Sequence, residues 1–266
     1  MNTDVLEVKN LIPILATPNT AVIITGGASG IGYAVAEALA AVGRPVAIWD
    51  INSERAERSA AIISEQYKVK AIGIGINIID VDKYDAAIDL SRNVLGNLGG
   101  LVHCAGIVDT GSLEGITLET WAAGIDTHLR PLAFLSQKLY RDFTLNKGSA
   151  IVTIASINAT LGNAINPIYS AAKGGMLSLV RSLADRLARD NIRINSVSPG
   201  QIHTPMVQAS LDSLPENFFE KRILLGRLGQ PEEIGRVVRF LLSDEASYIT
   251  AAEIVVDGGN ISSQRG

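Results

Sequence analysis

The sequence predicts an α/β protein in which one doubly wound parallel sheet carries helices on both faces. Short β-rich runs alternate along the chain with longer amphipathic segments, and this alternation is typical of a parallel sheet with crossover helices. Of the residues, 47% are hydrophobic and only 5% are aromatic, as buried strands and closely packed helices require. Since 266 residues suffice for one large domain, we expect residues 1–18 to form a loosely attached extension and residues 19–266 a single domain.

Each expected strand is a short β-rich run, and each expected helix is a longer amphipathic segment. The expected strands are Ala21–Thr25, Pro45–Asp50, Lys70–Ile76, Leu101–His103, Ser149–Ala155, Arg193–Ser198 and Glu253–Val256. The expected helices begin near Gly30, Ser53, Val81, Thr117, Pro167 and Pro231. Only the segment Gln201–Leu225, with Pro205 and Pro215, departs from the alternation of expected strands and helices. It is interpreted as a candidate active-site lid, the alternative being an ordinary surface excursion.

A glycine-rich turn follows the first expected strand directly, and a helix follows the turn. Its sequence is Thr25-Gly26-Gly27-Ala28-Ser29-Gly30-Ile31-Gly32. Glycines let the backbone turn tightly and approach a pyrophosphate, and a helix N-terminus offers free N–H groups with a partial positive charge. This order of strand, turn and helix predicts a Rossmann-type nucleotide site, with a purely structural turn as the alternative.

Asp50 ends the second expected strand, twenty residues after Gly30. A carboxylate at this position accepts hydrogen bonds from both adenosine ribose hydroxyls and repels a 2′-phosphate. No Arg or Lys lies in the glycine turn or directly after Asp50, and Arg55 is the first cation downstream. The sequence therefore predicts NAD(H) rather than NADP(H), unless Asp50 serves as a helix N-cap.

Tyr169 and Lys173 are four residues apart and share one face of an expected helix. A nearby ammonium lowers the pKa of a phenol, and such a phenol can exchange a proton with an alcohol or carbonyl. Ser156 precedes Tyr169 by thirteen residues and ends an apolar run. An ordinary surface pair is the alternative for Tyr169 and Lys173, but Ser156 and the glycine turn favour a catalytic site.

With these motifs, the chain resembles the compact single-domain branch of the short-chain dehydrogenases/reductases from about residue 20 to residue 259. The glycine turn matches the family's TGxxxGxG, and Ser156, Tyr169 and Lys173 match its catalytic triad. Other similar segments are Ser198–Gly200 with Thr204, which would border the nicotinamide, and the C-terminal signatures Gly226–Ile234 and Val256–Gly259.

The resemblance implies a role for each matching residue. Tyr169 would be the general acid/base, Ser156 would hydrogen-bond the substrate oxygen, and Lys173 would hold the nicotinamide ribose and lower the pKa of Tyr169. The residues implied at the cofactor are Gly26, Ser29, Gly30, Ile31, Gly32, Asp50, Asn77, Ile78, Ala105, Gly106, Tyr169, Lys173, Pro199, Gly200, Ile202 and Thr204. The residues expected at the substrate are Ser156, Asn158, Tyr169 and His203. No metal site is expected, because the histidines lack ligand spacing.

Two departures from the family pattern lie at residues 103–104 and at residue 77, and a third is His128. The family's Asn-Asn-Ala-Gly is here His103-Cys104-Ala105-Gly106, so asparagine hydrogen bonds are lost or replaced, and Cys104 is expected to be a small buried filler. Asn77 stands where the family often has an adenine-contacting aspartate.

His128 falls on the family's fourth catalytic residue, an asparagine associated with a water relay to the lysine. Neutral His128 could hold that water, and its protonation would then produce an acid limb in the pH profile of turnover. The alternative is that His128 ends its helix before Pro131, with its ring packed away from Lys173.

We expect an NAD(H)-dependent enzyme that interconverts a secondary alcohol and a ketone. The alternatives are a catalytically silent relative that acts as a binding or scaffold protein and, less favoured, a sugar-nucleotide epimerase or dehydratase. A net charge of −4 without a strongly basic stretch argues against nucleic-acid binding.

We expect a cytoplasmic homotetramer. The single cysteine fits a reducing compartment, and the apolar run Leu11–Leu15 is too short for a signal peptide or a membrane span. The segments Leu129–Phe143 and Ile168–Leu187 carry apolar residues over wide arcs, which leaves apolar surface for partner subunits. The strand Ile254–Val256 could build a second interface.

Overall fold

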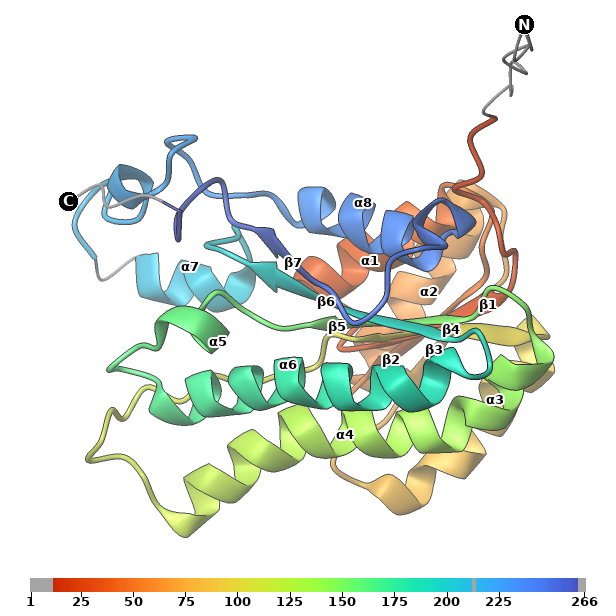
Figure 1. Ribbon diagram of the computed structural model, residues 1–266, viewed down its shortest axis with the longest axis horizontal. Helices are drawn as coiled ribbons and strands as arrows, with labels where there is room; N and C mark the ends of the chain where they lie inside the picture. The colour runs from red at the N-terminus through yellow and green to blue at the C-terminus, as the bar shows by residue number, and fades with distance from the viewer. Residues whose placement is uncertain (1–11, 212–213, 263–266) are drawn as a thin grey trace, which may run out of the picture.

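The computed structural model describes residues 12–211 and 214–262 and is built around a seven-stranded sheet (Figure 1). The strand order is β3-β2-β1-β4-β5-β6-β7, and all the pairings are parallel. The strands are β1 (Ala21–Thr25), β2 (Val46–Asp50), β3 (Ala71–Gly75), β4 (Leu98–His103), β5 (Ala150–Ile154), β6 (Arg193–Pro199) and β7 (Glu253–Val256). The order reverses between β1 and β4, so a crevice for a ligand is expected at the carboxyl ends of these two strands. The predicted fold class is confirmed.

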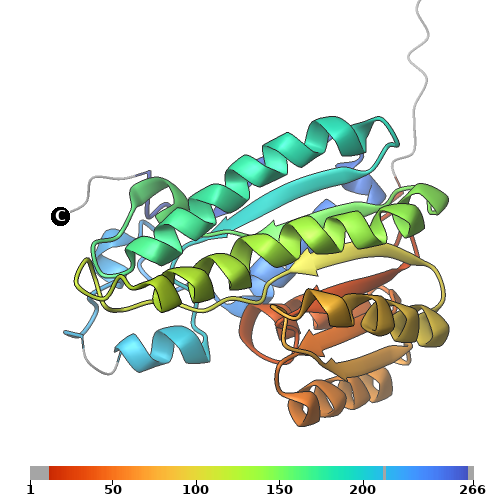
Figure 2. The same ribbon diagram turned by 90° about the horizontal axis from the view of Figure 1, so that it is seen from below.

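Helices cover both faces of the sheet (Figures 1 and 2). One face carries α1 (Gly30–Ala40), α2 (Ser53–Tyr67) and α8 (Pro231–Leu242). The other carries α3 (Tyr84–Leu95), α4 (Leu118–Leu145) and α6 (Pro167–Ala188). Short helices in the connections are η1 (Val81–Lys83), α5 (Asn158–Leu161), α7 (Pro205–Leu211), η2 (Glu220–Arg222) and η3 (Asp244–Ala246).

The alternation of side chains along β1 explains why the strand reads as a continuous apolar run. Ala21 and Ile23 pack under α3, α4 and α6, whereas Val22 and Ile24 pack under α1, α2 and α8. All four side chains are buried. Both faces of a parallel strand are covered by helices, so neither face selects polar residues.

The expected strands all form, and the largest difference lies at the start of β4, which begins at Leu98 instead of Leu101. Gly99 and Gly100 interrupt the apolar run, but the close packing of the strand requires both glycines. A Cβ on Gly99 would lie 2.2 Å from the Thr20 hydroxyl oxygen, and a Cβ on Gly100 would lie 2.7 Å from a methyl group of Val22. The candidate lid differs too, because the ordered helix α7 forms within it.

Helix α4 continues through Pro131, and so His128 does not end its helix as one interpretation predicted. A proline in a helix lacks the N–H that would bond the carbonyl four residues earlier, here that of Thr127. His103 at the end of β4 compensates from outside the helix. Its Nε2 lies 2.9 Å from the His128 carbonyl oxygen, and the Thr127 backbone also acts, more weakly, to raise the pKa of the ring.

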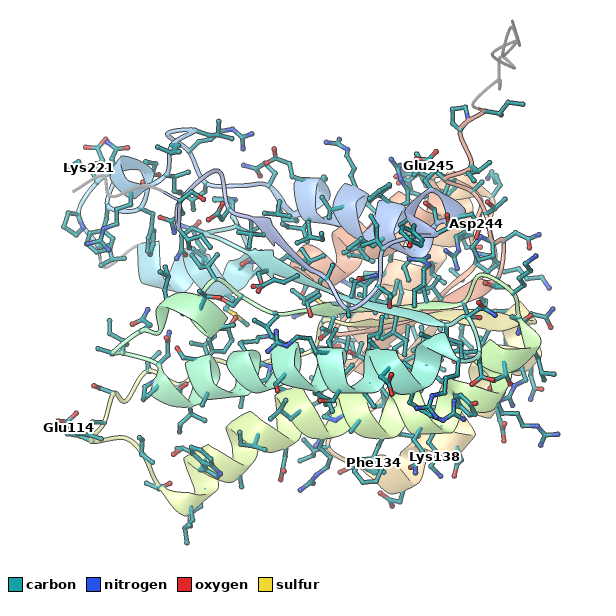
Figure 3. The ribbon with its side chains drawn as sticks, in the orientation of Figure 1. Glu114, Phe134, Lys138, Lys221, Asp244 and Glu245 are labelled. Atoms are coloured by element: carbon teal, nitrogen blue, oxygen red, sulfur yellow. The ribbon has the colours of Figure 1, made fainter. Side chains whose placement is uncertain are left out.

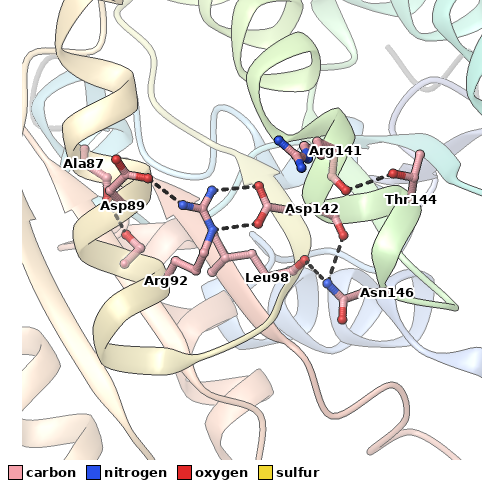
Figure 4. Close-up of polar contacts among 9 residues, drawn as sticks. Ala87, Asp89, Arg92, Leu98, Arg141, Asp142, Thr144 and Asn146 are labelled. Atoms are coloured by element: carbon pink, nitrogen blue, oxygen red, sulfur yellow. Dashed lines mark hydrogen bonds and ion pairs between the residues drawn. The ribbon is translucent and has the colours of Figure 1, made fainter.

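The C-terminal end of α4 is anchored to α3 and β4 (Figure 4). The Arg92 guanidinium donates two parallel hydrogen bonds to the Asp142 carboxylate, of 2.8 and 2.9 Å. Asn146 donates from its side-chain amide to the Leu98 carbonyl at 3.1 Å. Two parallel hydrogen bonds fix the orientation of the guanidinium relative to the carboxylate. This long helix is therefore held in place at the end remote from the crevice.

Residues 12–18 are the described part of the extension that the sequence predicts over residues 1–18, and they are hydrogen-bonded to η3. The Thr17 carbonyl accepts from the Asp244 N–H at 2.7 Å, and a Glu245 carboxylate oxygen accepts from the Ile14 N–H at 2.9 Å. Figure 3 places Asp244 and Glu245 at the end of the molecule opposite Glu114. Residues 1–11 lie outside the described part of the chain.

Candidate active site

A cavity of about 400 Å³ opens at the carboxyl ends of β1, β2, β4, β5 and β6. The residues implied at the cofactor all line it, and so do Ser156 and His128. Asn158 and His203, expected at the substrate, do not. The Asn158 side-chain amide instead donates to the side-chain oxygen Oδ1 of Asn166 at 3.2 Å, and His203 is exposed.

The glycine turn shapes the cavity beside α1. Gly26 and Gly30 have φ angles of 63° and 52°, a left-handed conformation that favours glycine. A Cβ on Gly32 would lie 2.1 Å from the Gly26 carbonyl oxygen. Ser29 is the N-cap of α1 but makes no capping bond with its side chain, and the first turn has no acidic residue. The N–H groups and the positive end of this helix therefore suit a phosphate.

Asp50 lies beside the turn and is held by two backbone N–H groups. Its Oδ2 accepts from Ala28 at 3.2 Å, and its Oδ1 accepts from Asn52 at 3.1 Å. The N-cap of α2 is Asn52, whose side chain accepts from the Arg55 N–H, so Asp50 is not the cap. Among the described residues that line the cavity, Lys173 is the one Lys or Arg. Together the turn and the fixed carboxylate fit the pyrophosphate and adenosine ribose of a dinucleotide.

Ser156, Tyr169 and Lys173 meet at the end of β5. The Lys173 ammonium lies 5.4 Å from the centre of the Tyr169 ring and donates to the Ile154 carbonyl at 2.6 Å. Ser156 Oγ accepts from the Asn158 N–H at 3.1 Å, and the Ser156 hydroxyl acts to lower the pKa of the Tyr169 phenol. Because the Asn158 N–H donates to Oγ, the Ser156 hydroxyl keeps its own proton to donate toward the Tyr169 phenol or toward an oxygen in the cavity.

Burial dominates the electrostatics of this group. Lys173 is only 3% exposed, and desolvation lowers the pKa of its ammonium to about 8. Burial also raises the pKa of Tyr169, and the hydrogen bond with Ser156 offsets part of that rise. The expectation that Lys173 lowers the pKa of Tyr169 is therefore wrong here, because desolvation of the phenolate outweighs any attraction by the ammonium.

His103 replaces the asparagine bonds of the family with bonds of its own. The Thr25 hydroxyl oxygen accepts from the Cys104 and Ala105 N–H groups, each at 3.2 Å. Its proton is therefore directed to His103 Nδ1, 2.9 Å away. The ring hydrogen is then on Nε2 and points at the His128 carbonyl. One neutral imidazole thus links β1, β4 and α4 at the base of the cavity.

The His128 ring is buried against Tyr169, with ring centres 5.5 Å apart in an edge-on arrangement. Its Nε2 lies 2.9 Å from the Ile107 carbonyl oxygen and 3.3 Å from the Ile107 backbone nitrogen. The shorter contact favours the hydrogen on Nε2, while Nδ1 has no hydrogen-bond partner among the described residues. Burial and then Lys173 lower the pKa of His128 to about 2. The imidazole is neutral, as expected, but the expected acid limb is wrong because its protonation lies far below working pH.

Several residues that line the cavity were not expected at the cofactor or the substrate, among them Cys104, Ile107 and Thr127. Burial raises the pKa of the Cys104 thiol to about 11, so the thiol stays protonated, as befits a packing residue. Ile107 directly follows Gly106, and this adjacency could have predicted that Ile107 lines the cavity. Thr127 directly precedes His128 in α4 and has the same kind of signal.

Within residues 12–211 and 214–262, no helix combines the length and apolar character that crossing a membrane requires. The same residues contain no group of three or more His, Cys, Asp or Glu side chains arranged to hold a metal ion.

Comparison with known proteins gives consistent matches over nearly the whole chain. A family model described as enoyl-(acyl carrier protein) reductase matches residues 26–260. The 3-oxoacyl-(acyl-carrier-protein) reductase FabG of Escherichia coli K12 is 35% identical over 237 residues, covering 89% of this chain and 95% of that protein. FabG of Chlamydia trachomatis is 34% identical over 244 residues, covering 91% and 97%.

Solved structures agree with these relatives. L-sorbose reductase of Gluconobacter frateurii, solved with NADPH and L-sorbose, matches with a TM-score of 0.86 at 26% identity, covering 91% of this chain and 97% of that one. A short-chain dehydrogenase/reductase of Brucella melitensis, described as glucose/ribitol dehydrogenase, matches with a TM-score of 0.84 at 31% identity, covering 91% and 96%.

Proposed function

We propose, since the chain belongs to the short-chain dehydrogenase/reductase family, that it interconverts a secondary alcohol and a ketone with NAD(H). Its relatives are oxidoreductases of the alcohol/ketone type. The observation that carries the proposal is the meeting of Ser156, Tyr169 and Lys173 on the same cavity as the glycine turn and Asp50. Proton transfer and dinucleotide binding are thereby brought to one place.

The triad supplies the proton and holds the reacting oxygen. The nicotinamide, when bound, exchanges a hydride with the carbinol carbon. Tyr169 gives its phenol proton to the ketone oxygen during reduction, and its phenolate takes the alcohol proton during oxidation. The Ser156 hydroxyl donates a hydrogen bond to the same oxygen. Both groups act in a buried site, where such bonds are stronger than in water.

Lys173 and His128 support this chemistry by holding the nicotinamide ribose and a relay water. The ammonium uses one N–H on the Ile154 carbonyl and keeps the others for the nicotinamide ribose. His128 stands in place of the family's asparagine, and its buried Nδ1 is an acceptor without a partner among the described residues. We assign to Nδ1 the relay water that the asparagine would hold, because a buried acceptor is costly unless it is hydrogen-bonded.

Asp50 favours NAD(H) over NADP(H). Its carboxylate is held by N–H groups of the neighbouring backbone, so it cannot easily turn away from a 2′-phosphate. No Arg or Lys lies near it among the described residues lining the cavity, because Lys173 is placed at the end of β5. The cofactor proposed for this chain thus differs from the NADPH with which L-sorbose reductase was solved.

The test is a panel of ketones and secondary alcohols assayed with both cofactors. The relatives indicate which carbonyl compounds to include, namely 3-oxoacyl thioesters and ketoses. We expect oxidation of NADH with at least one ketone and a lower kcat/KM with NADPH. NADH binding without turnover on the whole panel would favour the silent binding protein. Epimerised sugar nucleotide without net change in the cofactor would favour the epimerase.

We further propose that the protein is a homotetramer in the cytoplasm. A second hollow of about 450 Å³ lies on α4 and α6, lined by Phe134, Tyr140 and Leu183 among others. Phe134 is 41% exposed, and an exposed apolar hollow on two long helices suits a matching face of a second copy. The single cysteine, Cys104, supports a reducing compartment.

A further inference from the structure

Helix α6, which carries Tyr169, begins without a cap from its own sequence. Asn166 occupies the N-cap position, but its side chain makes no capping bond and instead accepts from the Asn158 amide at 3.2 Å. The first turn has no acidic residue. Pro167 has no N–H to satisfy, so the open donors at this end are those of Ile168 and Tyr169.

Asp109 supplies the missing cap from 60 residues away in the sequence. Its Oδ1 accepts from the Tyr169 N–H at 2.8 Å, and its Oδ2 accepts from the Ile168 N–H at 3.4 Å. These two N–H groups are the ones that an N-cap side chain normally bonds. The carboxylate also complements the positive end of the helix. The stronger of the two bonds is made to the backbone of the proton-transferring residue itself.

The short segment of residues 107–112 holds this carboxylate in place, because both of its ends are hydrogen-bonded to other elements. At one end the Ile107 carbonyl accepts from His128 Nε2 of α4 at 2.9 Å. At the other end the Ser112 hydroxyl donates to the Ala164 carbonyl, in the loop before α6, at 2.8 Å. The segment therefore ties α4 to the start of α6 along the wall of the cavity.

We propose that Asp109 is a positioning residue that fixes the first turn of α6 and thereby the Tyr169 phenol. The proposal rests on the function proposed above for Tyr169. Without the carboxylate the first turn would lose both capping bonds and the phenol would shift relative to the substrate oxygen. The cofactor-binding residues at α1 and β2 would stay in place, because Asp109 does not contact them. The expected signature is a loss of kcat without a comparable change in the KM for NADH.

Steady-state kinetics of three variants test this signature in the full-length protein. Asp109→Ala should lower kcat by about 10- to 100-fold, with the KM for NADH within about three-fold of wild type. Asp109→Asn should recover most of the loss, since an amide oxygen still accepts from the Tyr169 N–H and Asn caps as well as Asp. Glu114→Ala is the matched control, because Glu114 is an acid of the same connection that projects at its outer end (Figure 3). Equal kcat values for Asp109→Ala and Glu114→Ala would overturn the proposal.

Amide hydrogen exchange of residues 166–173 tests the cap independently of turnover. Exchange should be faster in Asp109→Ala than in wild type and unchanged in Glu114→Ala. Unchanged exchange in Asp109→Ala would overturn the capping role of Asp109. This result does not depend on turnover, so it is distinguishable from a failure of the proposed function, in which wild type would turn over no substrate. Faster exchange with wild-type kcat would overturn positioning. Should Asp109→Ala fail to fold, Asp109→Glu replaces it, since its added methylene displaces the carboxylate, and the same results are required of it.

Discussion

Lowering the pH from 7 to 5 should destabilise this protein through His103 and His128. Both side chains are fully buried, and burial first and Lys173 second lower their pKa values to about 3 and about 2. Both rings are therefore neutral in the folded state at either pH. In the unfolded chain each ring has a pKa of about 6.5 and gains a proton as the pH falls. Because the unfolded state binds more protons, the free energy of unfolding decreases below about pH 6.5.

The size of the effect follows from the same pKa values. One proton bound only by the unfolded state changes the free energy of unfolding by about 1.36 kcal/mol per pH unit. Between pH 6.5 and pH 5 each histidine therefore costs about 2 kcal/mol, and the two together cost about 4 kcal/mol. A typical domain has about 5–15 kcal/mol in total, so the loss is a large share of the stability.

Urea denaturation of wild type, His103→Asn and His128→Asn at pH 7 and pH 5 measures this loss. Asparagine is the family's residue at both positions and does not titrate. Each variant should lose about 2 kcal/mol less than wild type between the two pH values, whatever its stability at pH 7. Other titrating groups are common to all three proteins and cancel in this comparison. The same loss in all three proteins would refute the assignment of neutral, buried rings.

Two other predictions concern the cofactor and the assembly. Asp50→Ala should narrow the preference for NADH by relieving the repulsion of a 2′-phosphate, and should weaken NADH binding by about 1.5–3 kcal/mol through lost hydrogen bonds. Values of kcat/KM with both cofactors measure this, and equal or better use of NADPH by wild type would contradict it. Light scattering should give the mass of a tetramer, and Phe134→Glu should lower that mass by placing charge in the hollow on α4 and α6. A stable wild-type monomer at micromolar concentration would exclude the interface.

The strands and most helix starts could be predicted because their signals are local. The buried strands read as apolar runs, and the glycine turn is a contiguous motif with a strand before it and a helix after it. The cavity could be predicted as well, since the carboxyl ends of parallel strands meet at one edge of the sheet. Asp50 and Ser156 line this cavity because each follows or ends a strand that leads there.

Two of the features that the sequence does not show depend on compensation by residues distant in the sequence, and a third depends on burial. Pro131 predicts the end of a helix, but His103 bonds the His128 carbonyl near it, from a strand that ends 25 residues before His128. The start of α6 shows no cap in its own sequence because Asp109 provides one. The pKa of Tyr169 was misjudged because the pair with Lys173 is visible in the sequence, whereas the depth of burial is not.

The central claim is that Tyr169 transfers the proton in a cavity that binds NADH through other residues. Steady-state turnover and NADH binding by Tyr169→Phe test it most directly, with a ketone accepted by wild type. We predict a loss in kcat of about 10²–10⁴-fold, as expected for general acid–base catalysis, with an NADH dissociation constant close to that of wild type. Lys173→Met should damage both quantities, because its ammonium also holds the ribose. A Tyr169→Phe variant that keeps more than about a tenth of the wild-type kcat would contradict the claim.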